Sequence, residues 1–476
     1  MDDDLSVPSV GDLMDSDDLA ALTKAVEASK FKGSFGKHKT FYGIGDFDAV
    51  TVMGIGSDAL TRRQLHDLGG HTSNAPGAGS ILVVTDGFQT SVTNPAAELA
   101  VGYGLGDYSF RTYKTGKTGQ KGITNPSNDD RTVTFAVDDP AADQGLMDRE
   151  YTALIDAVTL ARDFGTEPGL SLYPEEFVQR VRAEARGIRN LRVRVMDERE
   201  LEREGMGGIY GVGKGSVHPP RLLILEYIGA GSDEAPLALV GKGITFDTGG
   251  ISLKPNNGQW LMKSDLSGAA AVAGTLLATA KRGADINVVG FMPLAENMPS
   301  ERAIRPGDVL STYNGTTIEI MSTDAEGRLL LADSVAYAEA NYDPALIVNI
   351  ATLTGSAARA VGDEYGVLIT RDWDLSMEMK AIGKRSGEDV WPLPLHPNHY
   401  QQINSDIADI KSTGGAPGAS IGAAVVGTFV SKDQPWVHLD IAGVDWRDSP
   451  TPTAPKGHAG WGVRFMDELV RTYEAK

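Results

Sequence analysis

The sequence predicts an α/β protein built from two domains, and three observations support this prediction. The chain of 476 residues is too long for one ordinary hydrophobic core. Its hydrophobic content of 41% and its charged content of 23% are typical of a soluble globular protein. From about Leu191 onward, apolar strand-like segments alternate with helix-like segments. Such alternation favours a mostly parallel or mixed sheet flanked by helices, in a large C-terminal domain that follows a smaller N-terminal α/β domain.

The N-terminal part contains the signals of an acidic arm and of a small domain. The first eighteen residues include seven Asp and neither Lys nor Arg, so we expect residues 1–18 to form a flexible arm. The pattern of apolar residues over 19–143 then predicts an α/β domain. Its expected elements are a buried strand at Ser80–Thr85, a helix at Asn94–Tyr103, a hairpin or loop at Tyr108–Gly122 and a strand at Arg131–Val137.

A long helical pattern connects this domain to the rest of the chain. Gln144–Phe164 carries apolar side chains at helical spacing, and Gly165–Gly169 is a set of helix breakers. We therefore expect a connecting helix and linker over residues 144–169 and the large domain over residues 170–476. The helices expected in the large domain are Pro174–Ala185, Gly268–Lys281, Gly327–Ala340 and Gly422–Phe429. The expected strands are Leu222–Tyr227, Leu237–Phe246, Ile286–Pro293 and Leu346–Ala351.

Charge and cysteine content exclude several classes of function. Lys and Arg number 44 against 64 Asp and Glu, which gives a net charge of -20. This surplus argues against nucleic acid and anionic membranes as partners, because both attract cationic surfaces. The chain has no Cys, which excludes disulfides, thiolate metal ligands and cysteine nucleophiles. The acidic start does not resemble a signal peptide, and no run of about 18 apolar residues occurs. We expect a cytoplasmic protein.

Charged residues gather in three turns that follow predicted strands or precede predicted helices, namely Lys242–Lys254, Met262–Gly268 and Ser322–Arg328. Ligands of α/β sheets bind beyond the carboxyl ends of the strands, so these turns can converge there. Carboxylates do not converge without a cation, because like charges in contact cannot all remain ionised. Two divalent ions about 3.5–4 Å apart would balance them and stabilise a hydrolytic transition state. The four carboxylates concerned are Asp247, Asp265, Asp324 and Glu326.

Each of these residues also has a purely structural interpretation. An Asp that precedes a helix, such as Asp265, is often a cap whose oxygen accepts unpaired backbone N–H groups. Lys242 and Lys254, taken singly, are of a type that is usually solvated. From the residues alone, two interpretations therefore remain open: a metal hydrolase, or a set of helix caps and solvated side chains.

Two segments resemble the signature sequences of a known family. Val240–Lys254 and Ser322–Leu329 are similar to those of the leucyl aminopeptidase (cytosol aminopeptidase) family. The second is close to that family's Asn-Thr-Asp-Ala-Glu-Gly-Arg-Leu motif. The similarity covers nearly all of residues 170–470 in order. It continues through Gly205–Gly208, Ala295–Ser300, Ala351–Gly355, Asp406–Asp409 and His438–Gly443.

The resemblance implies a homohexameric aminopeptidase that hydrolyses the N-terminal residue, Leu and others, from peptides by means of a two-metal-activated hydroxide. It implies two divalent ions, zinc or manganese, and a bicarbonate at Arg328. Asp247 and Glu326 would bridge the ions, Asp324 would complete one metal site, and Lys242 with Asp265 would complete the other. Lys254 and Arg328 would be catalytic. The residues expected to bind the substrate are Met262, Thr352, Leu353 and Gly355.

Three positions depart from the family pattern. Ser322 stands where Asn is usual, Ser267 where Gly is common, and His458 where a small or apolar residue is usual near the substrate pocket. The first two flank expected ligands, so we expect them to adjust the surroundings of the ligands without removing one. His458 bears on the substrate preference.

Other functions remain as alternatives. A two-metal phosphoesterase uses similar carboxylates, although a phosphate site is expected to contain more Arg and Lys. A non-catalytic scaffold of the same fold is a further alternative, against which the complete set of charged residues argues. Gly418–Gly422 matches a GxSxG nucleophile motif but lacks the strand that must precede it. Gly208–Lys214 nearly matches a phosphate-binding loop, but Gly215 follows where Ser or Thr is required.

Overall fold

The computed structural model of the chain describes residues 13–75, 79–85, 88–115, 132–137, 139–231 and 234–475. The chain divides into two compact units. The N-terminal unit comprises residues 1–152 and 449–455, and the C-terminal unit comprises residues 153–448 and 456–476. Residues 1–12 of the expected acidic arm and residues 116–122 of the expected hairpin or loop lie outside the described residues. The predicted domain limits remain predictions.

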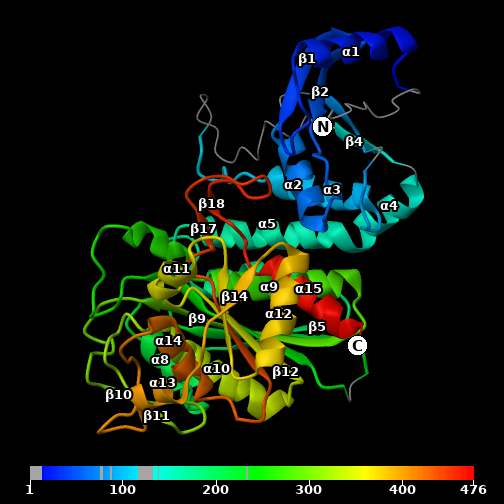
Figure 1. Cartoon of the computed structure of the whole chain (residues 1–476). Coiled ribbons are helices and arrows are strands. Elements are labelled where there is room, and N and C mark those ends of the chain that lie inside the picture. The colour runs from blue at the N-terminus through cyan, green and yellow to red at the C-terminus, as the bar shows by residue number, and fades with distance from the viewer. Residues whose placement is uncertain are drawn as a thin grey trace. The chain divides into compact units, whose positions relative to one another are not determined.

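The N-terminal unit contains two small sheets and several helices (Figure 1). β1 and β2 pair antiparallel, and β3 and β4 pair parallel. A π-helical turn, Met147–Tyr151, continues from α4 into α5, which crosses the division between the units. The elements are α1 (Ser16–Ala28), β1 (His38–Ile44), β2 (Phe47–Met53), α2 (Arg62–Ser73), β3 (Ser80–Val84), α3 (Pro95–Gly106), β4 (Thr132–Ala136), α4 (Pro140–Leu146) and α5 (Thr152–Thr166).

The strand expected at Ser80–Thr85 exists as β3, but the prediction that it is buried was wrong. Leu82 in its centre is 41% exposed. The reason is that, among the described residues, β3 pairs with β4 alone, and a sheet of two strands provides few side chains to cover both of its faces. An apolar run alone does not reveal how many strands will flank it.

The C-terminal unit holds the main sheet and most of the helices. A 3-10 helix at Gln259–Ser264 precedes α9. Within the described residues, no helix is both long and apolar enough to cross a membrane. The helices are α6 (Pro174–Glu184), α7 (Glu198–Arg203), α8 (Gly207–Gly213), α9 (Ser267–Arg282), α10 (Gly327–Tyr342), α11 (Gly355–Val361), α12 (Trp373–Ser386), α13 (Pro397–Gln402), α14 (Gly418–Gly427) and α15 (Val463–Glu474). The strands are β5 (Leu191–Met196), β6 (Arg221–Ile228), β7 (Leu237–Gly241), β8 (Gly243–Asp247), β9 (Asn287–Asn297), β10 (Val309–Ser311), β11 (Thr317–Glu319), β12 (Leu346–Ala351), β13 (Gly366–Thr370), β14 (Val390–Pro392), β15 (Ile410–Lys411), β16 (Trp436–Asp440), β17 (Trp446–Arg447) and β18 (Gly457–His458).

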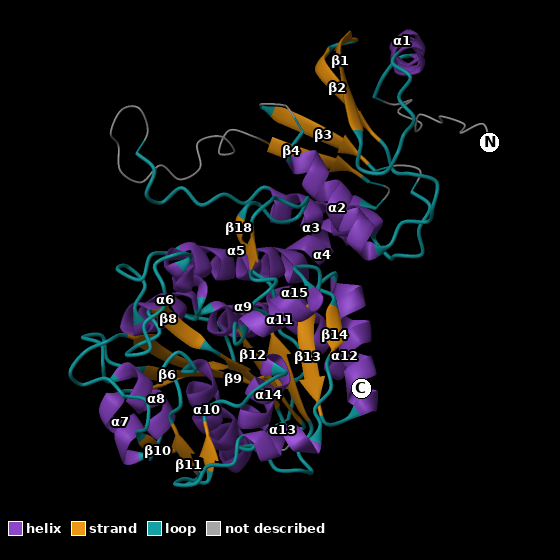
Figure 2. Cartoon of the chain, turned by 60° about the vertical axis from the view of Figure 1, so that its left-hand side comes forward, coloured by secondary structure: helices purple, strands orange, loops and turns teal. Residues whose placement is uncertain are grey.

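The main sheet is mixed, with a parallel centre, which confirms the predicted fold class. Its order is β14-β13-β16-β12-β7-β9-β6-β5, and β8 pairs with the end of β9. The neighbours β16, β12, β7 and β9 run parallel, whereas β13, β6 and β5 introduce antiparallel pairs. Helices α9 and α15 cover one face, and α10 and α14 cover the other (Figures 1 and 2). The central strands are buried throughout, because both faces of a parallel sheet are covered.

The strand expected at Leu237–Phe246 is divided in two at Lys242, a correction with a clear cause. The Lys242 N–H donates to the Ile350 carbonyl at 3.0 Å, and its carbonyl accepts the Ala269 N–H of α9 at 2.8 Å. β8 therefore continues only along β9, with a register irregularity after Ile244. The expectation of a single strand ran through Gly241-Lys242-Gly243, although a charged residue between two glycines interrupts the apolar pattern there. The break directs the Lys242 side chain beyond the sheet edge.

The carboxyl ends of the parallel strands meet at one edge of the sheet. Lys242 follows β7, Asp247 ends β8, Asn297 ends β9, Thr352 follows β12 and Asp440 ends β16. This is the edge at which ligands of α/β sheets bind.

Candidate functional site

The turn after β8 places Asp247 and Lys254 side by side. Gly249 and Gly250 both have positive φ, of 87° and 66°, which side chains rarely tolerate. The Gly249 N–H donates to Asp247 Oδ1 at 2.8 Å, and the Lys254 N–H closes the turn on the Thr248 carbonyl at 2.9 Å. The turn thus folds back on itself and returns Lys254 to the strand end.

A second turn, Ser322–Arg328, is attached to the first by hydrogen bonds. Thr323 Oγ1 donates to the Gly249 carbonyl at 2.6 Å and accepts from the Ser252 N–H at 2.8 Å. These bonds bring Asp324 to Lys254, whose Nζ lies 2.5 Å from Asp324 Oδ1 and 2.9 Å from Asp247 Oδ2. Lys254 therefore bridges carboxylates from two separate turns.

Lys242 occupies the equivalent place between the other two carboxylates. Its Nζ lies 2.7 Å from Asp265 Oδ1 and 2.8 Å from Glu326 Oε1, and it donates to the Thr352 carbonyl at 2.9 Å. A Cβ at position 327 would lie 2.8 Å from this Nζ, so Gly327 leaves the room that the lysine needs. Among the described residues, ligand atoms of Asp247, Asp265 and Glu326 lie within 4.8 Å of one another.

Electrostatics within this buried cluster favour ionised lysines. Burial by itself would lower the pKa of Lys242, but the carboxylates of Asp265, Glu326 and Asp247 outweigh it and raise the pKa above its ordinary value. Burial, followed by repulsion from Glu326, raises the pKa of Asp247 to about 6. Burial would likewise raise the pKa of Glu326, yet the two ammonium groups lower it. Glu326 is thus the carboxylate most firmly held in its charged form.

The cluster has the properties of a divalent cation site. Asp265 Oδ2 and Glu326 Oε2 are buried and have no hydrogen-bond partner within the described part of the chain. Buried carboxylate oxygens without a partner are costly unless something binds them. Carboxylate oxygens with an amine nitrogen suit zinc, manganese and similar ions without discriminating strongly among them. The residues present therefore fit divalent metal.

Arg328, which lies two residues beyond Glu326, is 8% exposed. Its Nη1 donates to the Ser412 carbonyl at 2.9 Å, while its Nε has no partner among the described residues. Burial lowers the pKa of Arg328, with the nearby Glu326, Asp440 and Asp324 opposing this. The guanidinium nevertheless remains protonated and cannot act as a base.

The residues expected to bind substrate stand in two segments beside the cluster. Met262 lies in the 3-10 helix that leads to Asp265 and is half-buried. Thr352 and Leu353 follow β12 and are half-buried, and the Thr352 hydroxyl donates to Asp265 Oδ1 at 2.7 Å. Gly355 begins α11 and is exposed. Thr352 is therefore bound to the cluster, and the other three are less buried than Lys242, Asp247, Asp265 and Glu326. Asp324, the remaining metal-ligand candidate, has a side chain that is 39% exposed.

His458 is buried. It is 2% exposed, its Nε2 lies 2.8 Å from Ser267 Oγ, and its ring packs against Gly165. Two positions that depart from the family pattern thus contact each other behind Asp265.

The discounted motifs have structural roles. Ser420 of the GxSxG sequence lies within α14, which begins four residues earlier than expected, and its hydroxyl donates to the Pro394 carbonyl at 2.8 Å. Gly208–Lys214 overlaps α8, whose glycines allow neighbouring segments to approach closely. Gly208, for example, lies against the backbone of Leu329. Neither segment has the form of a nucleophile elbow or a phosphate loop.

Sequence reasoning missed Asn297 as part of the site. Its Nδ2 donates to Asp247 Oδ1 at 2.7 Å and to the Thr323 carbonyl at 3.0 Å, so one buried amide joins two ligand-bearing turns. Only its place within the Ala295–Ser300 similarity could have drawn attention to it.

Replacement of Asn297 by Ala is expected to weaken the binding of divalent metal about 10–100-fold, as is typical when a group that orients a ligand is removed. Competition with a chromophoric chelator measures this. Asn287→Ala is the matched control, because Asn287 is also buried, begins the same strand, and bonds Ala230, Gly231 and Glu234 instead. An equal loss in both variants would show that the effect arises from β9 in general.

Comparisons with known proteins identify the family to which the chain is similar. The chain matches the description "Cytosol aminopeptidase family, catalytic domain" over residues 159–466 and "Cytosol aminopeptidase family, N-terminal domain" over residues 3–117. A probable cytosol aminopeptidase of Methylobacterium radiotolerans is 39% identical over 487 residues, covering 100% of this chain and 94% of that protein. One from Gluconobacter oxydans is 38% identical, covering 97% and 93%.

Solved structures give the same result. The bottromycin maturation enzyme BotP in complex with Mn has a TM-score of 0.85 and 32% identity, covering 94% of this chain and 96% of that one. The cytosol aminopeptidase from Coxiella burnetii has a TM-score of 0.82 and 28% identity, covering 94% and 92%. The chain therefore belongs to the cytosol aminopeptidase family and is a metal-dependent exopeptidase, a hydrolase that removes residues from the N-termini of peptides.

Proposed function

We propose that this aminopeptidase uses two divalent metal ions, held by Asp247, Asp265, Asp324, Glu326 and Lys242, to hydrolyse Leu and other residues from peptide N-termini. The observation that carries the proposal is the cluster itself, in which carboxylates from three turns surround two lysines at the carboxyl edge of the sheet. Asp247 and Glu326, being central, would bridge the ions. Asp324 would complete one site, and Lys242 with Asp265 the other. When bound, the ions would polarise the scissile carbonyl and provide hydroxide near neutral pH.

Lys254 would stabilise the charge that develops on the carbonyl oxygen. Its side chain lies at the edge of the cluster and is 21% exposed, so a substrate would be able to reach it. Burial would lower the pKa of Lys254, but the carboxylates of Asp247 and Glu326 raise it above the ordinary value. A permanently charged donor that is already in position is the kind of group that favours an oxyanion.

Arg328 would hold a small planar anion, and we propose bicarbonate. The planar guanidinium presents donors in a fork that matches such an anion, and its Nε lacks a partner among the described residues. A bound bicarbonate would accept and return the proton that Arg328 itself cannot transfer.

The central assay of this proposal is hydrolysis of leucine p-nitroanilide. We expect activity to vanish after chelation, to return with zinc or manganese, and to fall at least about 100-fold in Asp324→Ala, because a ligand has been removed. Asp308→Ala is the matched control, since the Asp308 carboxylate accepts from Arg305 and lies outside the cluster. If the metal-loaded protein hydrolysed none of the Leu, Met, Ala and dipeptide substrates, the proposed function would be wrong.

Met262, Thr352, Leu353 and Gly355 would line the pocket for the N-terminal side chain. Replacing Met262 by Ala is expected to reduce the rate on Leu and Met substrates about 10-fold more than on Ala, because a large apolar contact is lost. The ratio of kcat/KM values on these p-nitroanilides measures the change. Unchanged ratios would remove Met262 from the pocket.

We also propose zinc, with manganese able to replace one ion, a cytoplasmic location and a homohexamer. Several large apolar side chains of the C-terminal unit are exposed, and burying them between copies of the chain would favour self-association. Leu170 and Val217 are each 90% exposed, Trp373 is 69% exposed and Trp260 is 61% exposed. The mass of the assembly in solution tests the homohexamer, for which we expect six times 50.5 kDa.

A further inference from the structure

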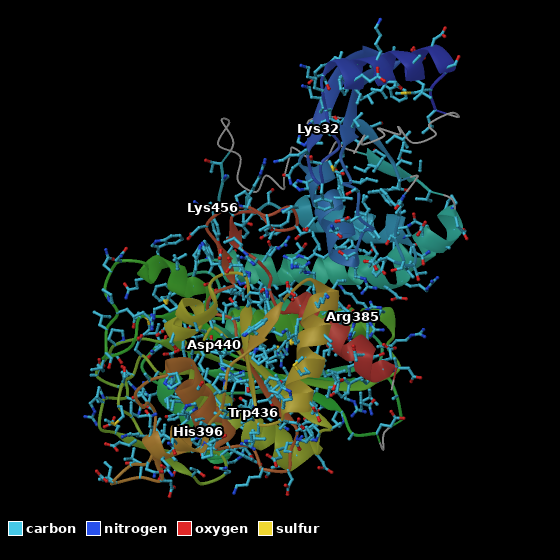
Figure 3. All side chains as sticks on the ribbon, in the orientation of Figure 1. Lys32, Arg385, His396, Trp436, Asp440 and Lys456 are labelled. Carbon is cyan, nitrogen blue, oxygen red and sulfur yellow. The ribbon has the colours of Figure 1, made fainter. Side chains whose placement is uncertain are left out.

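Two buried aspartates beyond the end of β16 stand outside the proposed set of metal ligands. Asp440 is the last residue of the strand and is 1% exposed, and Asp445 follows one turn later and is 6% exposed. Figure 3 shows Asp440 and Trp436, which mark the two ends of β16. The turn between the aspartates is fixed, because the Val444 and Asp445 N–H groups both donate to the Ile441 carbonyl.

Asp440 binds the loop that follows β12. Its Oδ1 accepts the N–H groups of Leu353 at 3.1 Å and Thr354 at 3.3 Å, and its Oδ2 accepts the Thr354 hydroxyl at 2.7 Å. Oδ1 also accepts the Ala442 N–H at 3.3 Å, which ties the carboxylate to its own turn. One side chain thus determines the path of the residues immediately after Thr352.

Asp445 binds the turn that carries Asp265. Its Oδ2 accepts the hydroxyl of Ser264 at 3.1 Å and that of Ser267 at 3.3 Å, and these two serines flank Asp265 on either side. Ser267 is held from a second direction by His458 at 2.8 Å. The neighbouring Trp446 packs edge-on against Trp260, at the start of the same 3-10 helix, with ring centroids 5.7 Å apart.

The two bound loops meet at the cluster. The Thr352 hydroxyl donates to Asp265 Oδ1, and the Thr352 carbonyl accepts from Lys242 Nζ. Asp247 and Asp324, in contrast, belong to turns held together by Asn297 and Thr323. The side chains that support the two halves of the cluster are therefore different, although the Ile244 N–H of β8 also donates to the Asp265 carbonyl at 3.2 Å.

We infer that Asp440 and Asp445 are positioning residues for one of the two proposed metal subsites, the one completed by Lys242 and Asp265. The inference rests on the proposed two-metal function. Neither aspartate touches an expected metal position. They act through the loops that hold Thr352 and Asp265, so their loss affects one subsite and leaves the other intact.

The test is a calorimetric titration of chelator-treated protein with Mn²⁺. Elemental analysis confirms how much metal is bound. The wild type is expected to bind two ions. In Asp440→Ala and in Asp445→Ala, we expect one of the two ions to bind at least about 10-fold more weakly. Asp324→Ala weakens the ion on the opposite side, so combining it with Asp440→Ala is expected to weaken both.

The conservative variants separate positioning from a general structural role. Asp445→Asn retains an oxygen that can accept both serine hydroxyls. Asp440→Asn retains an oxygen for the N–H groups of Leu353, Thr354 and Ala442, and its amide N–H can donate to Thr354 Oγ1 in place of the bond that Oδ2 accepted. We therefore expect nearly wild-type binding of both ions. Asp333→Ala is the matched control in the same unit. Asp333 is fully buried, accepts the N–H groups of Ile209 at 2.9 Å and Tyr313 at 2.8 Å, and contacts neither loop. Burial raises its pKa to about 7, as it does that of Asp445. We expect lower stability in Asp333→Ala and two ions bound normally.

The outcomes distinguish the inference from the function on which it rests. A wild type that binds fewer than two ions would overturn both. A wild type that binds two, with Ala variants that bind both normally or lose both equally, would overturn the inference alone. Equal weakening in Asp333→Ala would also overturn it. Circular dichroism shows whether each Ala variant folds. If one does not, Thr354→Val and Ser267→Ala replace it, because each removes a single hydroxyl donor to Asp440 or Asp445. In these two variants we expect one ion to bind more weakly and the other to bind normally.

Discussion

Three buried carboxylates in contact with two buried or half-buried lysines are the constraint on which the rest of the structure depends. Like charges at this distance are tolerated only when opposite charge lies between them, and Lys242 and Lys254 supply it here. Such a cluster is costly to bury, because removing ions from water costs several kcal/mol each unless the geometry is excellent. The surrounding fold therefore has to hold every participant in place, and metal ions are the natural partners of the oxygens left unbonded.

The parallel sheet meets this requirement by bringing its carboxyl ends to one edge. Charged residues far apart in sequence, such as Lys242 and Glu326, come together because their strands and helices end there. Rigid strands also set the starting points of the turns, and hydrogen bonds from Asn297, Thr323, Asp440 and Asp445 fix their paths. A site supported in this way is already organised before substrate binds, which is what electrostatic catalysis requires.

The class of fold and the position of the cluster could be predicted from the sequence for definite reasons. Strand-then-helix alternation identifies a sheet covered on both faces, and turns after strands are brought to one edge of it. The break at Lys242 was not predicted, although Gly241-Lys242-Gly243 interrupts the apolar pattern of Leu237–Phe246. It depends on contacts with Ile350 and Ala269, which are distant in sequence. The exposure of β3 depends similarly on which strands flank it.

Supporting residues were beyond sequence reasoning for another reason. Asn297, Asp440 and Asp445 are polar residues at or after strand ends, where a cap or a solvated side chain is the usual interpretation. Their roles emerge only when the partner turns are known. Helices α12 and α15 and strand β16 were not predicted either, although β16 supplies Asp440.

The central claim is that Lys242 exchanges its proton for a metal ion, and the proton released on binding tests it most directly. Calorimetric titration with Zn²⁺ at pH 8, in buffers of different ionisation enthalpy, counts that proton. Since the carboxylates keep the Lys242 pKa above its ordinary value, the lysine is protonated beforehand and must lose its proton to coordinate. The account predicts at least one proton released per protein, and about one fewer in Lys242→Met. Metal binding without proton release, or equal release in that variant, would contradict it.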